Sequence, residues 1–181
     1  LNLTPDSFYD GGKYNTVDRA LKQTDSIIKA GANFVDLGAY STKPGAKPVT
    51  VEAEKKRLLP VLERLTKIHP KTHFSIDTFR STVAADALDR GAAMINDISG
   101  GQFDNKMMNT VGYYNVPYVL MHTSGKPETM QKNPKYKDVV KEVIYYFSNQ
   151  IQSAYKAGIN DVIIDPGFGF GKTISHNYEI L

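Results

Sequence analysis

Cysteine is absent from this sequence, which therefore has no disulfide framework, no thiolate metal site and no cysteine nucleophile. Long apolar runs are missing as well. No stretch approaches the roughly 18 residues that a membrane helix needs, and no basic segment followed by an apolar one marks a leader. The lysines are spread along the chain without forming a basic run, so nucleic acid is not an expected partner. We expect a cytoplasmic protein that acts on small molecules, with no nucleic-acid or membrane partner.

The residues that are present have the composition of a globular domain. The chain has 181 residues, of which 41% are hydrophobic and 23% charged, and this is enough apolar material for one core. We expect one domain over residues 1–181. The net charge of +3 favours an anionic substrate. Because the sequence starts with Leu1 and not with Met, we expect an amino end that is cut or processed.

Short apolar strand patterns alternate with amphipathic helical patterns, which predicts βα units and a parallel sheet. Helical spacing predicts about five helices and a sixth that starts near Ser175. Thr50 is expected to cap the second helix, and Pro60 to kink or shorten it. The residues Val162 to Ile164 have the β-branched composition of a strand buried on both faces. We expect about six strands, at residues 1–3 (the tail of a strand), 34–37, 74–77, 94–98, 118–122 and 162–165.

Each predicted strand ends in residues with a polar head: Asn2, Asp36, Asp77, Asn96 with Asp97, His122 and Asp165. In parallel α/β proteins, and above all in (βα)8 barrels, ligands bind at this end of the strands. A barrel needs eight units and about 250 residues, whereas this pattern stops after about six units. The pattern alone therefore leaves two folds open, an open doubly wound sheet and an incomplete barrel.

Six sequence blocks follow one another over essentially the whole chain. They are residues 2–12 (NLTPDSFYDGG), 41–46 (STKPGA), 75–78 (SIDT), 95–100 (INDISG), 121–122 (MH), and 165–173 (DPGFGFGKT) followed by His176 and Asn177. Together they closely resemble the dihydropteroate synthase family. The resemblance implies an α/β fold of the TIM (βα)8 barrel type, here incomplete with about six βα units. It also implies a transferase of folate synthesis, which condenses 6-hydroxymethyl-7,8-dihydropterin pyrophosphate with p-aminobenzoate to give 7,8-dihydropteroate and pyrophosphate.

The resemblance places the pterin ring against Asp77, Asn96 and Asp165. An aminopyrimidinone edge offers several N–H donors and one carbonyl, so carboxylates and an amide are suitable partners. Two acids also stabilise the cationic pterin methylene that forms when pyrophosphate leaves first. Met121 is expected to pack under the pterin, and Gly169 to let the ring approach the backbone.

The implied cofactor is Mg²⁺, and Asn2 matches the magnesium-binding asparagine of the family. A single neutral oxygen is a weak ligand set. Mg²⁺ commonly keeps several waters and takes further oxygens from a bound pyrophosphate, whose charge it neutralises.

The second substrate is expected in two early loops and in the last one. The positions that match those near p-aminobenzoate, or that would hold its anion, are Phe8, Thr42, Lys43, Pro44 and Phe170. No covalent nucleophile is expected, because an aryl amine is neutral at pH 7 and attacks through its lone pair. The resemblance assigns no role to His122 or His176, and we expect structural hydrogen bonds from them.

Several positions depart from the family pattern. Ala39 and Tyr40 stand where Gly-Glu is usual, and Lys43 replaces a more common arginine, which predicts a looser anion contact. The Ser-Arg-Lys and Arg-x-His motifs of the seventh and eighth strands have no counterpart and are expected beyond Leu181. We therefore expect the isolated chain to be inactive and to expose an apolar sheet edge that favours aggregation. For the complete protein we expect a homodimer.

Features of the sequence also suggest three other functions. Gly171-Lys172-Thr173 suggests a nucleotide-binding P-loop, but Pro166 stands where that motif needs glycine, which excludes it. A methyltetrahydrofolate-corrinoid methyltransferase shares the pterin-binding barrel and the Asp/Asn set. It is not expected to carry the TPDSF and STKPG loops. A non-catalytic pterin-binding fragment is the third alternative.

Overall fold

The protein is built around one parallel β-sheet. The structure, a computed structural model, describes residues 1–4, 16–40, 49–125, 130–131 and 134–181. The five strands of the sheet are β1 (Phe34–Gly38), β2 (His73–Asp77), β3 (Met94–Asp97), β4 (Tyr118–Met121) and β5 (Val162–Asp165). All four strand pairs are parallel, and the strands lie in chain order.

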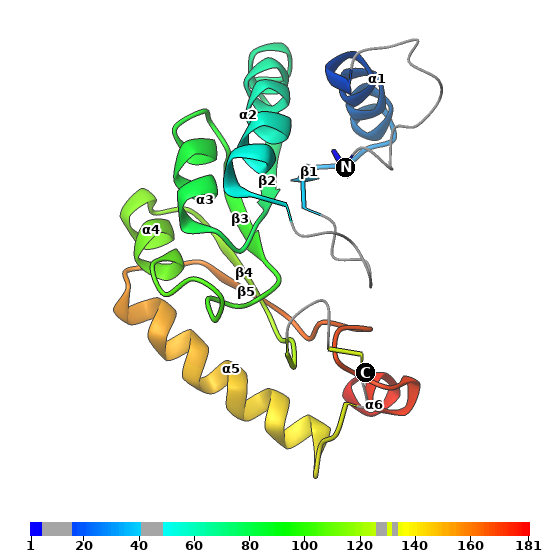
Figure 1. The fold of residues 1–181 in the computed structure, drawn as a ribbon, viewed down its shortest axis with the longest axis vertical. Helices are drawn as coiled ribbons and strands as arrows, with labels where there is room; N and C mark the ends of the chain where they lie inside the picture. The colour runs from blue at the N-terminus through cyan, green and yellow to red at the C-terminus, as the bar shows by residue number, and fades with distance from the viewer. Residues whose placement is uncertain (5–15, 41–48, 126–129, 132–133) are drawn as a thin grey trace.

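The order of the strands decides between the two predicted folds. Each strand pairs with the next one in the sequence, with no reversal of direction across the sheet. A doubly wound sheet reverses its strand order at a switch point, whereas a barrel does not. In Figure 1 the helices α1 to α5 follow an arc around the outside of the strands. The prediction of an incomplete barrel with about six βα units is confirmed.

The expected strand at residues 1–3 is present as a single bridge. Asn2 pairs in parallel with Gly38, and Leu3 N donates to Gly38 O at 2.7 Å. The return bond runs from Gly38 N to Leu1 O at 3.1 Å. Asn2 is thereby placed beside the end of β1, where the sequence predicted the first functional residue.

Six helices occur among the described residues: α1 (Thr16–Lys29), α2 (Val51–Ile68), α3 (Ser81–Leu88), α4 (Met107–Tyr114), α5 (Val139–Lys156) and α6 (Ile174–Ile180). The predicted cap of α2 is confirmed, since Thr50 Oγ1 accepts a hydrogen bond from Ala53 N at 3.2 Å. The predicted shortening at Pro60 is wrong, because α2 continues to Ile68. Pro60 lies on the exposed side of the helix, and burial of Leu58 and Leu62 on the other side offsets the missing backbone hydrogen bond.

The two faces of the sheet differ in character. Pairs in register point their side chains to the same face, and the face changes with every residue along a strand. Val35, Leu37, Phe74, Ile76 and Leu120 share the face that packs against the helices, and none of them is more than 2% exposed. We call the opposite side the inner face. Apolar and polar side chains alternate among its residues, and the polar ones are gathered toward the carboxyl ends of the strands: Asp36, Ser75, Asp77, Asn96 and Asp165.

The strand β5 differs from its prediction. It was expected to be buried on both faces, but Ile163 is 50% and Ile164 is 51% exposed. Among the described residues β5 pairs with β4 alone, so no strand covers its other edge. The expected exposure of an apolar sheet edge is therefore confirmed.

Candidate active site

The predicted pterin residues come together because of the strand register. Asp77 is the partner of Gly38 on one side and of Asn96 on the other, and Met121 is the partner of Asp165. All four side chains lie on the inner face at the carboxyl ends of their strands. Four residues predicted from separate stretches of sequence therefore share one edge of one sheet.

A hydrogen bond crosses this edge on the inner face. Asn96 Nδ2 donates to Asp36 Oδ2 at 3.2 Å, and the strand β2 lies between the two residues. The other oxygen of Asp36 and the hydroxyl of Ser75 are buried, and neither has a hydrogen-bond partner in the described structure. Buried polar atoms without partners are costly, so a polar ligand on this face would be stabilising.

The Asp77 carboxyl has unusual electrostatics. Burial raises its pKa to about 8, and the nearby carboxylates of Asp36, Glu54 and Asp97 act in the same direction. The missing side chain of Gly38 leaves space for this carboxyl, because a Cβ on Gly38 would lie 3.0 Å from Asp77 Oδ2. Asp77 is consequently protonated at pH 7 in the ligand-free protein.

Asp97 follows Asn96 but faces away from the inner face. Its carboxylate accepts hydrogen bonds from Ser99 N (2.7 Å), Gly101 N (2.9 Å) and the Tyr118 hydroxyl (2.7 Å). Burial nevertheless raises its pKa. Asp97 therefore organises the turn after β3, and Asn96 is the member of this pair that reaches the inner face.

The glycine-rich loop after β5 lies directly on the end of β4. Asp165 Oδ1 accepts a hydrogen bond from Gly167 N at 2.8 Å, which turns the chain immediately after the strand. Gly167 has φ +68°, and a Cβ on it would lie 2.1 Å from His122 O. Only glycine fits this contact. The loop therefore packs against the end of β4 and lies next to Met121, which is 3% exposed.

Lys172 holds this loop together. Its side chain is 4% exposed, and Nζ donates to the carbonyls of His122 (3.3 Å), Gly167 (3.1 Å) and Phe170 (3.0 Å). Nζ also lies 2.9 Å from His122 Nδ1. Burial lowers the pKa of Lys172 to about 8, against the opposing effect of Asp165. No role was predicted for Lys172 from the sequence, where the P-loop is excluded.

The two histidines near this loop make structural contacts. Burial, followed by the charge of Lys172, lowers the pKa of His122 to about 4, so the ring is neutral at pH 7. It packs edge-on against Tyr146, with the ring centroids 4.8 Å apart. His176 completes a capping box at the start of α6, where its Nδ1 accepts from Thr173 N at 3.2 Å.

The remaining predicted residues have varied positions. Gly169 has open space within 4 Å of a Cβ built on it, and its N–H donates to Asn177 Oδ1 at 3.0 Å. Phe170 is half-buried and lies two residues before Lys172. The positions Phe8, Thr42, Lys43 and Pro44 lie outside the described residues.

Asn2 offers a limited set of ligands for a metal. Its Oδ1 accepts a hydrogen bond from Thr4 N at 2.9 Å, which leaves one lone pair of that oxygen for a cation. The described part of the chain holds no group of three or more His, Asp, Glu or Cys side chains that could bind a metal. The donor set fits Mg²⁺ only if water and a substrate supply the other oxygens.

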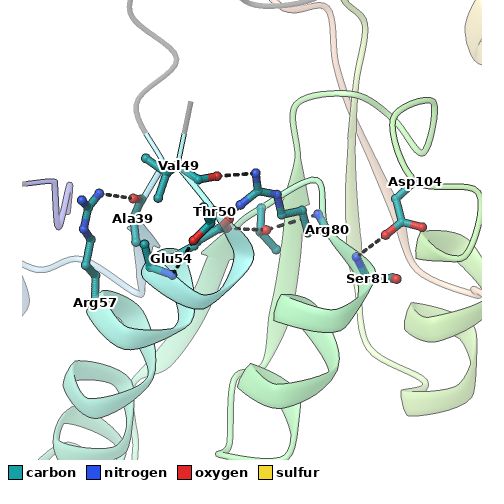
Figure 2. A network of polar contacts seen from close by, with 10 residues as sticks. Ala39, Val49, Thr50, Glu54, Arg57, Arg80, Ser81 and Asp104 are labelled. Atoms are coloured by element: carbon teal, nitrogen blue, oxygen red, sulfur yellow. Dashed lines mark hydrogen bonds and ion pairs between the residues drawn. The ribbon is translucent and has the colours of Figure 1, made fainter. Parts of the chain in front are cut away.

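Sequence reasoning missed a polar network beside Asp77 (Figure 2). Glu54 is 1% exposed, and its carboxylate accepts from Thr78 Oγ1 at 2.7 Å and from Arg80 Nη1 at 2.6 Å. Glu54 was expected only to favour the first turn of α2 as an acid, and no role was predicted for Arg80. One signal was available: Glu54 stands in the apolar stripe of α2, four residues before the buried Leu58, where an acid needs a partner.

Comparison with known proteins gives a consistent result. The family model described as "Pterin binding enzyme" matches residues 1–181. The dihydropteroate synthase of Escherichia coli K12 is 43% identical over 183 residues, and the match covers 100% of this chain and 64% of that protein. The dihydropteroate synthase of Synechocystis is 39% identical, with coverage of 100% and 63%.

Solved structures agree with these relatives. The dihydropteroate synthase of Xanthomonas albilineans with 4-aminobenzoic acid matches with a TM-score of 0.90 at 40% identity, over 99% of this chain and 63% of that one. The Yersinia pestis synthase in a sulfonamide drug complex matches with a TM-score of 0.91 at 38% identity, over 99% and 66%. The chain thus spans 63% and 66% of the lengths of these two structures. With its whole length matched by the family model, the chain belongs to the pterin-binding enzyme family.

Proposed function

We propose that the complete protein to which this chain belongs is a dihydropteroate synthase. The observation that carries the proposal is the inner-face edge, where the register places Asp77 beside Asn96 and Met121 beside Asp165. This edge offers two carboxyls and an amide next to an apolar methionine, which is the chemistry that a flat aminopyrimidinone ring requires. The names of the similar proteins, among them a synthase crystallised with 7,8-dihydropteroate, support the same choice.

In this proposal the acids bind the pterin edge and stabilise its cation. Asp77 is protonated before the pterin binds, since its pKa is about 8. N–H donors of a bound pterin favour the carboxylate, so pterin binding lowers this pKa and releases a proton. The two carboxylates at the pterin edge then stabilise the positive charge that the conjugated ring takes up as the C–O bond to pyrophosphate breaks.

The second substrate supplies its own nucleophile. The lone pair of the aryl amine forms a C–N bond to the methylene carbon, pyrophosphate departs with the electrons of the C–O bond, and the amine loses one proton to solvent. No side chain has to form a covalent bond in this sequence. The half-buried Phe170 is suited to border the aryl ring, because Lys172 fixes its carbonyl at 3.0 Å.

We also propose Mg²⁺ as the cofactor, with Asn2 as its protein ligand. The ion would neutralise the charge of pyrophosphate. The free lone pair of Asn2 Oδ1 supports this assignment, and the remaining oxygens would come from water and from the leaving group.

The isolated chain should not turn over. Two cations described at this rim, the partly buried Arg80 and the buried Lys172, both donate to protein acceptors, so neither is left to bind pyrophosphate. We further propose that the complete protein is a cytoplasmic homodimer. Among the described helices none is long and apolar enough to cross a membrane. Cell fractionation and light scattering of the complete gene product test these two statements.

The decisive experiment is an assay of the complete gene product for 7,8-dihydropteroate, with and without Mg²⁺. We expect product that depends on the ion, and no turnover by the 181-residue chain. Methyl transfer to a cobalamin without dihydropteroate formation would favour the corrinoid methyltransferase instead. The absence of both activities, together with retained pterin binding, would favour a non-catalytic pterin-binding protein.

Replacing Asp165 by Ala in the complete protein tests the pterin assignment. Loss of a charge-assisted contact should weaken the binding of pterin pyrophosphate by about 2–4 kcal/mol in calorimetry. Asp161→Ala is the matched control, because Asp161 is exposed and lies just before the same strand. Equal affinities of the two variants would show that Asp165 does not contact the pterin.

A further inference from the structure

The side chain of Asn96 is held by Asp36, which lies two strands away in the sheet. Asn96 Nδ2 donates to Asp36 Oδ2 at 3.2 Å. The backbone of Asn96 is fixed as well, because its carbonyl accepts a hydrogen bond from Thr78 N at 3.1 Å. Both side chains of the pair are carried by strands, β1 and β3, and not by loops. Asn96 is therefore anchored through its backbone and through its amide nitrogen.

The bond to Asp36 determines which way the Asn96 amide faces. The oxygen and the nitrogen of an amide have nearly the same shape, so packing alone does not distinguish the two orientations. A carboxylate has acceptors alone, so the amide turns its nitrogen toward Asp36 and its oxygen away from it. The oxygen can then accept from an N–H donor of the pterin edge. A flipped amide would place a donor against a donor.

Asp36 lies too deep to be a direct contact of the same ring edge. It stands two residues before Gly38, and Gly38 is the register partner of Asp77. Two residues correspond to about 7 Å along a strand, so the Asp36 backbone is that much further from the strand ends than Asp77 and Asn96. The side chain of Asp36 reaches the predicted pterin residues through its bond to the Asn96 amide.

The surroundings of Asp36 are those of a residue placed for a ligand site. Its Oδ1 is buried, and so is the hydroxyl of its register partner Ser75. Neither atom has a hydrogen-bond partner within the part of the chain that the structure describes. A buried carboxylate oxygen in this state is costly to the fold. Such costs are expected where a side chain serves a site and not stability.

We propose that Asp36 is a positioning residue for the pterin substrate, because it orients the Asn96 amide with its oxygen available to the ligand. The inference rests on the proposed function, which assigns Asn96 to the pterin edge. It adds to that function the kind of pterin atom that Asn96 binds, which is an N–H donor. It also assigns Asp36 an effect on the pterin that depends on its hydrogen-bond acceptor and not on its charge.

The charge of Asp36 has a separate effect that the experiment must remove. After burial, the Asp36 charge is the next cause of the raised pKa of Asp77. Glu54 and Asp97 act in the same direction, and the Leu1 amino group acts against them. Any neutral residue at position 36 should therefore lower this pKa. Binding is best measured at pH 9, where Asp77, with its pKa of about 8, is ionised with or without the Asp36 charge.

The test compares two neutral replacements of Asp36 in the complete gene product, with pterin pyrophosphate binding measured by calorimetry. Asp36→Leu keeps the branched shape but cannot accept a hydrogen bond, whereas Asp36→Asn keeps one acceptor oxygen. We expect Asp36→Leu to weaken binding about tenfold and Asp36→Asn by about threefold or less. The matched control is Asp89→Asn, because Asp89 is exposed at the end of α3, where it accepts from the Tyr114 hydroxyl at 2.7 Å. This control should leave binding unchanged.

A double-mutant cycle shows whether Asp36 acts through Asn96. The variant with both Asp36→Leu and Asn96→Ala should bind within about twofold of Asn96→Ala alone, since the amide that Asp36 orients is already gone. If Asp36→Leu does not fold, Asp36→Ala takes its place in the comparison and in the cycle. Losses that multiply in the double variant would show that Asp36 acts independently of Asn96.

Other outcomes overturn the inference in distinguishable ways. Equal losses in Asp36→Leu and Asp36→Asn would assign the effect to the charge and not to the acceptor. A lower melting temperature with unchanged pterin binding would assign Asp36 a purely structural role. If the wild-type protein makes no dihydropteroate, the proposed function fails and this inference fails with it. An active wild type with an unaffected Asp36→Leu variant removes the inference alone.

Discussion

The rim of the sheet holds two cations with little exposure, Lys172 and the partly buried Arg80, and the surrounding protein stabilises them in different ways. Arg80, beyond the end of β2, pairs with the buried carboxylate of Glu54. Lys172, beyond the end of β5, is held by three backbone carbonyls and an imidazole nitrogen. Burial lowers its pKa to about 8, and the carbonyl dipoles offset the lost hydration less than a carboxylate partner would. The network at β2 depends on charge, whereas the loop at β5 depends on hydrogen-bond geometry.

The largest effect is expected when the charge pair is broken. Glu54→Ala leaves Arg80 without its carboxylate and Thr78 without its acceptor, and should lower the free energy of unfolding by about 3 kcal/mol. That value is at the low end for buried pairs because the Arg80 side chain is 20% exposed. Denaturant unfolding measures it. Glu63→Ala is the control, since Glu63 forms an exposed ion pair with Lys67 and should change stability by less than about 0.5 kcal/mol. Equal losses in both variants would mean that burial of the pair is unimportant.

A smaller loss is expected at the other end of the sheet. Lys172→Met removes the donor for three carbonyls but also relieves the burial of an ammonium without a carboxylate partner. The net cost should be about 2 kcal/mol. Lys156→Met, at an exposed position in the last turn of α5, should stay within about 0.5 kcal/mol of wild type in the same denaturant experiment. If Lys172→Met were as stable as Lys156→Met, the carbonyl contacts would contribute nothing to folding.

The smallest expected effect is on the pH dependence of the free energy of unfolding, which should differ between variants at the two cation sites. Folded Lys172 releases its proton near pH 8, whereas the unfolded chain retains that proton to about pH 10.5. Between these values the unfolded state binds more protons, so stability rises with pH. Wild type should gain about 1 kcal/mol relative to Lys172→Met between pH 8 and 9. The difference between wild type and Glu54→Ala should instead fall with pH, because Glu54 helps to raise the pKa of Asp77, which is about 8 in the folded protein. A flat Lys172 difference would contradict the proposed environment of the ammonium.

The residues at the strand ends could be predicted from the sequence, whereas the polar contacts that surround them could not. Asp77, Asn96 and Asp165 could be placed on one edge because parallel strands of similar length end together, and the register confirms this. The partner of Glu54 could not be predicted, since Arg80 lies 26 positions away and meets it only in the folded chain. The contacts of Lys172 likewise require a loop that lies against the end of another strand.

Two predictions, on Pro60 and on β5, differ from the structure because tertiary surroundings outweigh local sequence. Pro60 was expected to kink or shorten α2; the helix is not shortened, because its opposite face is buried, and the kink stays a prediction. Ile163 and Ile164 have the composition of a buried strand, yet both are about half exposed because β5 has a strand on one side alone among the described residues. Composition reports what a strand can bury, whereas neighbouring strands decide what it does bury.

The chain-order arrangement of the sheet also sets the order in which the site can form during synthesis. Each strand pairs with the strand made just before it, so a growing chain does not have to wait for a distant segment. The contact between Asn96 and Asp36 can close once β3 has docked, before residues 118–165 have been translated. The strands that carry Asp77 and Asn96 can therefore pair first, and the strands β4 and β5, which bring Asp165, dock onto them later.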